Sequence, residues 1–171
     1  MLKDTVLDKL NNQFNCEVFS AYLYFSMAGY FESVNLKGFA NWMEIQAQEE
    51  LTHAHRLYKY VIDRGSRPKM AAIDAPRQDW GSPLEAMQEA YDHECQISAL
   101  INDSVSLVLK ENDHSTNSML QWFVNEQVEE EAVADDIVQK LKLIAGNSTG
   151  LYLLDSELSR RTASFEGGGA G

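Results

Sequence analysis

All three prolines of this 171-residue chain fall between positions 68 and 83, and most of its ten glycines lie near the ends of segments. Because proline breaks a helix and glycine weakens one, the rest of the chain is free to form long uninterrupted helices. Apolar residues recur there at spacings of three and four, the period of an amphipathic helix. In the first segment these are Val6, Leu7, Leu10, Phe14, Val18, Ala21, Phe25 and Ala28. The chain is therefore predicted to be all-α.

Turn and capping signals divide this pattern into four long helices and a short fifth one. Gly65 followed by Pro68 marks the end of the second helix. Ser82-Pro83-Leu84-Glu85 is a capping box that starts the third, and Asn112-Asp113 caps the fourth. The expected helices span about 4–34, 37–64, 83–111, 114–145 and 151–161. We expect residues 1–161 to form one domain and the glycine-rich residues 162–171 to be a flexible tail.

The connection over residues 65–81 is irregular in composition and long for a compact domain. A helix of about 28 residues is roughly 42 Å long, and about 17 extended residues at roughly 3.3 Å each can span that length. The connection can therefore cross the whole bundle, which would make the second and third helices parallel.

The balance of charge restricts the partners of the chain. With 26 acidic and 14 basic residues, the formal net charge is −12, which disfavours nucleic acid and anionic membranes and attracts cations. Two cysteines are too few for a disulfide framework, and residues 1–10 lack the apolar run of a signal peptide. No stretch approaches the roughly 18 uninterrupted apolar residues of a membrane-spanning helix. We therefore expect a cytoplasmic protein with no membrane or nucleic-acid partner.

Each long helix carries carboxylate or amide side chains on its apolar stripe, near its own midpoint. These residues are Glu17, Glu50, Glu94, Gln127 and Glu130. An unpaired ionised carboxylate is expensive to bury, and a divalent cation removes that cost. Because helix midpoints coincide in parallel and in antiparallel pairs, all five side chains can converge at one level of the bundle.

His53 completes the predicted ligand set. Glu50 and His53, at i and i+3, lie on one helical face and can reach one metal ion, although this spacing alone is common on solvated helices. Tyr24 and Gln127 would be nearby hydrogen-bonding groups. Oxygen-rich sites with a single imidazole suit iron or manganese better than structural zinc, and we favour iron. Without metal, such crowded carboxylates should have raised pKa values.

A second acidic set lies one residue away from the first along the helices. Glu49, Glu126 and Glu129 are turned by about 100° from Glu50, Gln127 and Glu130. They would lie beside the buried site. The alternative is an ordinary solvated acidic face.

Together these residues resemble the ferroxidase centre of the ferritins of the non-haem bacterial and archaeal type. The similarity covers about residues 2–161 and also includes Ala21-Tyr22-Leu23-Tyr24 and Phe39-Ala40-Asn41-Trp42. The resemblance implies a ferritin-like four-helix bundle with a long crossover between the second and third helices and a short fifth helix. It implies storage and detoxification of iron, with Fe(II) oxidised by dioxygen or hydrogen peroxide and stored as ferric mineral.

The resemblance also assigns roles to residues. It implies a first iron site at Glu17, Glu50 and His53, with Glu50 bridging to a second site at Glu94 and Glu130, beside Gln127. A third iron would bind Glu49, Glu126 and Glu129, with Glu130 shared. Tyr24, and Trp122 one turn before Gln127, would be redox-active or orienting aromatic residues, although both also suit a packed core.

The family implies a homo-oligomeric shell of twenty-four subunits, in which the short fifth helix lines one class of axis. Haem-containing bacterioferritins have a second Glu-x-x-His motif and a methionine before the first motif's histidine. Here Glu130 and Thr52 occupy those places, so we expect no haem.

Two other classes of function remain open on the residues alone. The chain could be a metal-independent helical interaction module, or a di-iron oxidase acting on an organic substrate. Cys16 and Cys95 each adjoin a proposed ligand but point about 100° away from it, so we expect them to pack as small hydrophobic residues. We expect no ligand role for the other histidines, which are His55, His93 and His114.

Overall fold

The computed structural model describes residues 1–163 and contains, in this part of the chain, five helices and no strands. The helices are α1 (Asp4–Ser33), α2 (Lys37–Asp63), α3 (Pro83–Lys110), α4 (His114–Ile144) and α5 (Ser148–Leu158). The all-α prediction is confirmed. Most of the predicted tail, residues 164–171, lies outside the described residues. None of the described helices is long and apolar enough to cross a membrane.

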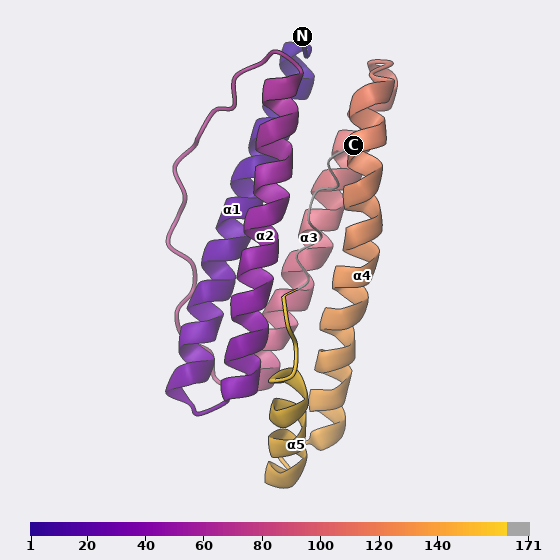
Figure 1. Cartoon of the computed structure of the whole chain (residues 1–171). Helices are drawn as coiled ribbons and strands as arrows, with labels where there is room; N and C mark the ends of the chain where they lie inside the picture. Colours follow the sequence, from indigo (N-terminus) through magenta and orange to yellow (C-terminus); the bar gives the residue numbers. More distant parts are fainter. Residues whose placement is uncertain (164–171) are drawn as a thin grey trace.

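The four long helices form a bundle of two antiparallel pairs, α1 with α2 and α3 with α4 (Figure 1). The connection between α2 and α3 runs the length of the bundle along α1, so α2 and α3 are parallel, as predicted. Side chains of α1 form hydrogen bonds with the backbone of this crossover. Asn11 Oδ1 and Asn15 Oδ1 accept from the backbone N–H groups of Lys69 and Ala71, both at 2.9 Å.

The predicted helix ends have the expected capping groups. Ser82 Oγ accepts from the Glu85 N–H at 3.1 Å, and Asp113 Oδ1 accepts from the Thr116 N–H at 3.1 Å. The capping box of α3 differs in one detail, because the Glu85 carboxylate accepts from the Gly81 N–H at 2.8 Å. Gly65 has φ 69°, the left-handed conformation expected after α2.

The predicted bounds of the fifth helix were wrong by three residues at each end. α5 begins at Ser148 and ends at Leu158. Asn147 is its N-cap, since Asn147 Oδ1 accepts from the Gly150 N–H at 3.0 Å. The predicted helix excludes residues 146–150, with the sequence Gly-Asn-Ser-Thr-Gly, but asparagine followed by small polar residues is also a helix start.

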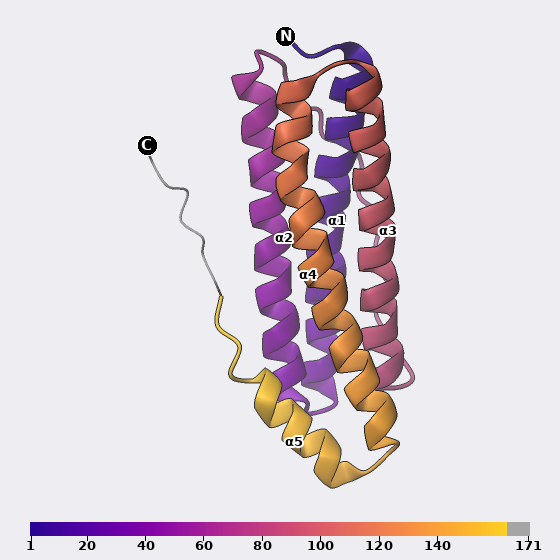
Figure 2. The same cartoon turned by 90° about the vertical axis from the view of Figure 1, so that its right-hand side faces the viewer.

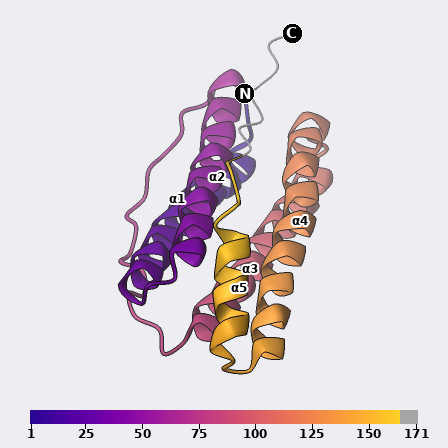
Figure 3. The same ribbon diagram turned by 60° about the horizontal axis from the view of Figure 1, so that its bottom comes forward.

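α5 lies across one end of the bundle and packs on α2 and α4 (Figures 2 and 3). Asp155 Oδ1 accepts from the backbone N–H groups of Gly38 and Phe39, at 2.8 and 3.0 Å. α5 therefore supplies the capping carboxylate that α2 lacks in its own sequence. A Cβ at Gly38 would lie 1.7 Å from the Asp155 carbonyl oxygen, so this contact requires glycine.

The buried core is split into two apolar clusters by a polar layer at mid-height. The cluster toward α5 includes Tyr24, Phe31, Phe39, Met43, Met87 and Val138. The cluster at the opposite end includes Leu10, Leu57, Ile101, Leu120 and Phe123. The polar layer between them consists of Gln13, Glu17, Gln46, Glu50, His53, Glu94 and Gln127, all buried. The two apolar clusters provide the hydrophobic stabilisation that allows this polar layer to be buried.

We predict that Gly38→Ala loosens the docking of α5. The added methyl group overlaps the Asp155 carbonyl, so we expect a loss of about 1 to 3 kcal/mol in the free energy of unfolding. Amide hydrogen exchange within residues 148–158 should become faster. Gly29→Ala is the matched control, because a Cβ there would have no neighbour within 4 Å beyond the adjacent residues and the backbone of its own helix. It should leave the exchange of α5 unchanged, and equal effects of both variants would contradict the proposed steric role of Gly38.

Candidate metal centre

The polar layer receives its ionisable side chains from all four long helices. Glu17 comes from α1, Glu50 and His53 from α2, and Glu94 from α3, and each is at most 4% exposed. From α4, Gln127 is buried and Glu130 is partly buried at the edge of the layer. Each position lies near the middle of its helix, which brings these side chains to one level.

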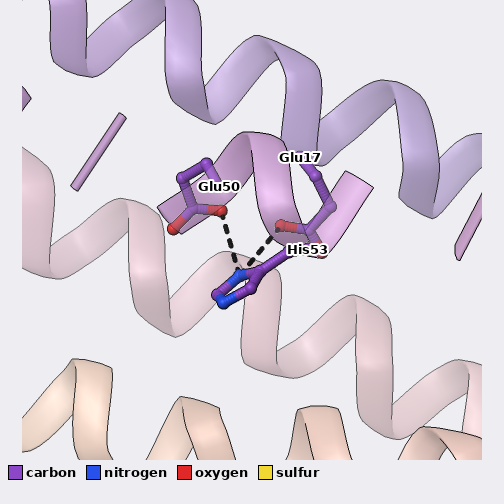
Figure 4. A group of neighbouring side chains, drawn as sticks. All are labelled: Glu17, Glu50 and His53. Carbon is purple, nitrogen blue, oxygen red and sulfur yellow. Dashed lines mark ion pairs between the residues drawn. The ribbon is translucent and has the colours of Figure 1, made fainter. Parts of the chain in front are cut away.

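Glu17, Glu50 and His53 form the tightest group of potential metal ligands in the described chain. One ligand atom from each residue lies within 4.8 Å of the others. The distances from His53 Nδ1 are 3.5 Å to Glu50 Oε2 and 4.0 Å to Glu17 Oε2. Figure 4 shows the three side chains converging on one point. They offer oxygen and nitrogen donors of the kind that hold iron or manganese.

Two atoms of this group have no hydrogen-bond partner within residues 1–163. Glu17 Oε2 and His53 Nδ1 are buried and unpaired, which is costly in a protein interior. The other Glu17 oxygen accepts from Gln13 Nε2 at 2.6 Å. A cation between Glu17, Glu50 and His53 would satisfy both unpaired atoms, so these residues fit a bound divalent metal.

Glu94 and Glu130 lie in the same layer with partners of their own. The Tyr24 hydroxyl donates a hydrogen bond to Glu94 Oε1, and Gln127 Nε2 donates one to Glu94 Oε2 at 3.0 Å. Gln46 Nε2 donates to Glu130 Oε2 at 2.6 Å and approaches Glu50 Oε1 at 3.5 Å. Hydrogen bonds therefore connect Glu94 to Tyr24 and Gln127, and Glu130 to α2.

Sequence reasoning missed Gln13 and Gln46. Each precedes a buried glutamate by four residues, in Gln13-x-x-x-Glu17 and Gln46-x-x-x-Glu50, so each shares a helical face with the carboxylate that it contacts. This repeated spacing is a signal that the sequence contains. An amide on an apolar stripe, four residues before a buried acid, indicates a group that orients that acid.

Burial and mutual repulsion raise the pKa values of the clustered carboxyl groups. The pKa of Glu17 is well above its usual range, chiefly through burial and then through Glu50. The pKa of Glu50 is raised well above its usual range by burial and then by Glu94. Burial, followed by repulsion from Glu94, raises the pKa of Glu130 to about 7. The pKa of Glu94 is also raised by burial. These directions agree with the expectation for crowded carboxylates without metal.

Aromatic rings cover His53 on the side of α4. The His53 ring centroid lies 5.3 Å from that of Trp122 and 6.0 Å from that of Phe123, both in edge-on geometry. Arg56 lies over Trp122, with Cζ 4.0 Å from the ring centroid. Trp122, predicted as a nearby aromatic residue, therefore packs edge-on against the imidazole of His53.

The second acidic set lies outside the buried group. Glu49 and Glu126 are partly buried and Glu129 is exposed. Glu49 Oε2 forms an ion pair with Arg161 Nη2 at 2.5 Å. Burial raises the pKa of Glu49, whereas the Arg161 guanidinium opposes this increase. Sequence reasoning missed Arg161, because nothing in its local sequence indicates that it reaches α2.

The two cysteines and the other three histidines do not belong to the group formed by Glu17, Glu50 and His53. Cys16 and Cys95 are partly buried free thiols. His93 Nε2 lies 2.7 Å from Ser20 Oγ, and burial lowers the pKa of His93 to about 4. His55 and His114 are exposed.

Comparison with known proteins agrees with this fold. A model of the ferritin-like domain matches residues 7–144. A bacterial non-heme ferritin of Bacteroides fragilis is 40% identical over 94% of this chain and 100% of the relative. One of Escherichia coli is 38% identical, covering 93% and 96%. An open pore ferritin from the archaeon Archaeoglobus fulgidus superposes with a TM-score of 0.94 at 47% identity, covering 95% of this chain and 100% of that chain.

The matched region contains the whole polar layer, and the similarity extends over nearly the full length of each relative. The chain therefore belongs to the ferritin family, and within it to the non-haem type of bacteria and archaea.

Proposed function

We propose that this iron-storage chain is a ferroxidase, which oxidises Fe(II) at the polar layer before the iron is stored as ferric mineral. The observation that carries this proposal is the pair of buried, unpaired atoms Glu17 Oε2 and His53 Nδ1, which face each other across a space lined by Glu50. A metal-independent bundle would have no reason to retain such a costly arrangement.

Two Fe(II) ions are the substrate of the proposed centre. Glu17, Glu50 and His53 would bind the first ion, and Glu94 and Glu130 the second, with Glu50 between them. The proximity of Glu50 to His53 on one side and of Gln46 to both Glu50 and Glu130 on the other supports this division. Gln127 and Tyr24 would orient Glu94 through their hydrogen bonds to its two oxygens.

The anionic oxygen ligands favour oxidation, because they stabilise the higher charge of Fe(III) more strongly than that of Fe(II). Two Fe(II) ions lose two electrons in total. These electrons, with two protons, reduce dioxygen to hydrogen peroxide, or hydrogen peroxide to water. Tyr24 and Trp122 lie beside the ligands and would be the aromatic groups nearest to this electron transfer.

Glu49, Glu126 and Glu129, with Glu130 shared, would hold a third iron on the way out of the centre. Their greater exposure supports a transit role, because an ion bound there is nearer to solvent. We further propose a homo-oligomeric shell of twenty-four subunits in the cytoplasm, without haem, in which α5 is an assembly element. The similarity to non-haem ferritins over nearly the whole chain supports this assembly.

The direct test is aerobic loading of the assembled protein with Fe(II). We expect fast oxidation, followed by a high-mass fraction that retains far more iron than its binding sites can hold. Stopped-flow absorbance with dioxygen or hydrogen peroxide, followed by size exclusion with an iron assay, measures both. Retention of no more iron than the binding sites hold would instead favour a di-iron oxidase acting on an organic substrate.

We predict that His53→Ala slows Fe(II) oxidation by at least about 100-fold, since groups that merely support ligands already contribute about 10- to 100-fold. The shell should remain assembled, because the removed ring lies between two intact apolar clusters. His55→Ala is the matched control on the exposed face of the same helix. Oxidation at the parental rate in His53→Ala would exclude His53 as a ligand.

We predict a pH dependence of stability that Glu130 helps to determine. Its pKa is about 7 in the folded protein and near the ordinary value of about 4.3 in the unfolded chain, so the folded state binds more protons between these values. The contribution of Glu130 to the stability of metal-free protein is therefore lost as the pH rises through about 7.

Denaturant unfolding of metal-free protein, with chelator present, tests this sign. From about pH 5 to about pH 8, the parent should lose more stability than Glu130→Gln, which cannot ionise at this position. Parallel curves for the two proteins would show that Glu130 has the same pKa in both states.

A further inference from the structure

The side chain of Arg161 extends from the segment after α5 to the edge of the polar layer. Its Nη2 pairs with Glu49 Oε2 at 2.5 Å, and its Nη1 donates to Gln46 Oε1 at 2.9 Å and to the Trp42 carbonyl at 3.3 Å. Arg161 Cζ also lies 4.5 Å from the centroid of the Trp42 ring. One guanidinium therefore contacts an acid, an amide and an aromatic face, all on α2.

The contact with Gln46 determines which way its amide faces. A guanidinium has only donors, so the Gln46 carbonyl oxygen must face Arg161 and the amide nitrogen must face the other way. That nitrogen donates to Glu130 at 2.6 Å and approaches Glu50 at 3.5 Å. Arg161 thereby acts on two proposed iron ligands through one intervening amide.

The contact with Glu49 restricts cation binding. Oε2 of Glu49 already carries a charge-assisted hydrogen bond from the guanidinium. A metal ion that takes this oxygen as a ligand must compete with a positive charge that belongs to the chain itself. Like charges cannot both occupy one carboxylate oxygen at close range without a large repulsive cost.

We propose that Arg161 is a positioning residue of the metal centre: it neutralises Glu49 and orients Gln46, and a divalent cation that binds Glu49 must displace it. This inference rests on the proposed ferroxidase function. Arg161 then sets the affinity of the Glu49 side of the centre and keeps it low. A weakly held ion on that side can move on, which suits iron in transit to storage.

The same geometry connects the metal centre to α5. Asp155 docks α5 on the start of α2, and Asn41 Nδ2 donates to the Arg161 carbonyl at 3.2 Å. These two contacts hold the segment after α5 at a defined place on α2. The cation and the Arg161 side chain compete for Glu49 in an equilibrium. Displacement of Arg161 by a cation must therefore loosen the segment after α5, and loosening that segment must favour binding of the cation. Occupancy of the Glu49 side and order at the end of α5 are therefore coupled.

The test uses Zn²⁺, which has no redox chemistry, and calorimetric titration of assembled, metal-free protein. In Arg161→Gln the weakest class of zinc site should bind zinc about tenfold more tightly, because the variant lacks the charge-assisted contact that competes with zinc in the parent. Arg161→Lys, which keeps the charge but not the two-pronged geometry, should fall between the parent and Arg161→Gln. Arg160→Gln is the matched control, because Arg160 is exposed and has no side-chain partner in residues 1–163.

Amide hydrogen exchange gives a second readout, independent of oxidation. In the parent, zinc should accelerate exchange at residues 159–161, whose N–H groups donate to the last turn of α5. In Arg161→Gln exchange there should already be fast and should not respond to zinc. This response separates a competing cation from a residue that only stabilises the fold.

Unchanged affinity of the weakest zinc site in Arg161→Gln, or equal tightening in Arg160→Gln, would overturn the inference. The second result would mean that only net charge matters. If Arg161→Gln does not assemble, the parent is compared with Arg161→Lys instead, and equal zinc affinities of these two proteins would reject the inference.

Fast Fe(II) oxidation in all variants, with no change in zinc affinity, would refute the role of Arg161 alone. Absence of both zinc binding and oxidation in the parent would refute the proposed function.

Discussion

The cost of burying ionisable groups at mid-height governs the architecture of this bundle. Glu17, Glu50 and Glu94 are almost fully removed from solvent, and an isolated carboxylate in such a place would be strongly destabilising. The chain offsets this cost with long apolar segments above and below the layer and with amides that donate to the acids. Burial still raises the pKa of Glu17 well above its usual range. A bound divalent cation would compensate the negative charge of these carboxylates directly. Helix length follows from the same constraint, because each helix must supply apolar surface on both sides of its ligand.

The contacts of α5 extend this arrangement to residue 161. Gly38 permits the close approach of Asp155, and Asp155 satisfies N–H groups at the start of α2 that have no cap from their own sequence. The same docking brings Arg161 to Glu49 and Gln46. The α5 helix, whose apolar face suggests a role in assembly, thus also places a positive charge beside the proposed centre. The start of α2 and the polar layer at its middle therefore belong to one connected set of interactions.

Much of the fold was predictable because its signals are local. The proline-free segments, the Ser82 cap and the glycine at 65 depend on backbone chemistry within a few residues, and all appear as expected. The fifth helix shows the limit of such signals, since Asn147 suits both a turn and an N-cap. The burial of Glu17, Glu50 and Glu94 was also predictable, because a glutamate on an apolar stripe is conspicuous. Gln13 and Gln46 were missed, since an amide is less costly to bury and so less conspicuous than an acid.

The sequence by itself determined the four long helices, a connection long enough to cross the bundle, and the level at which Glu17, Glu50, His53 and Glu94 meet. Helical periodicity and the midpoint positions contain that information. Only the tertiary structure decided which of these groups pair, which atoms remain without a partner, and that Arg161 reaches Glu49 across 112 positions of chain. The physical reason is that side-chain partners between helices depend on rotation, separation and side-chain conformation of packed elements. No local pattern of residues specifies these quantities.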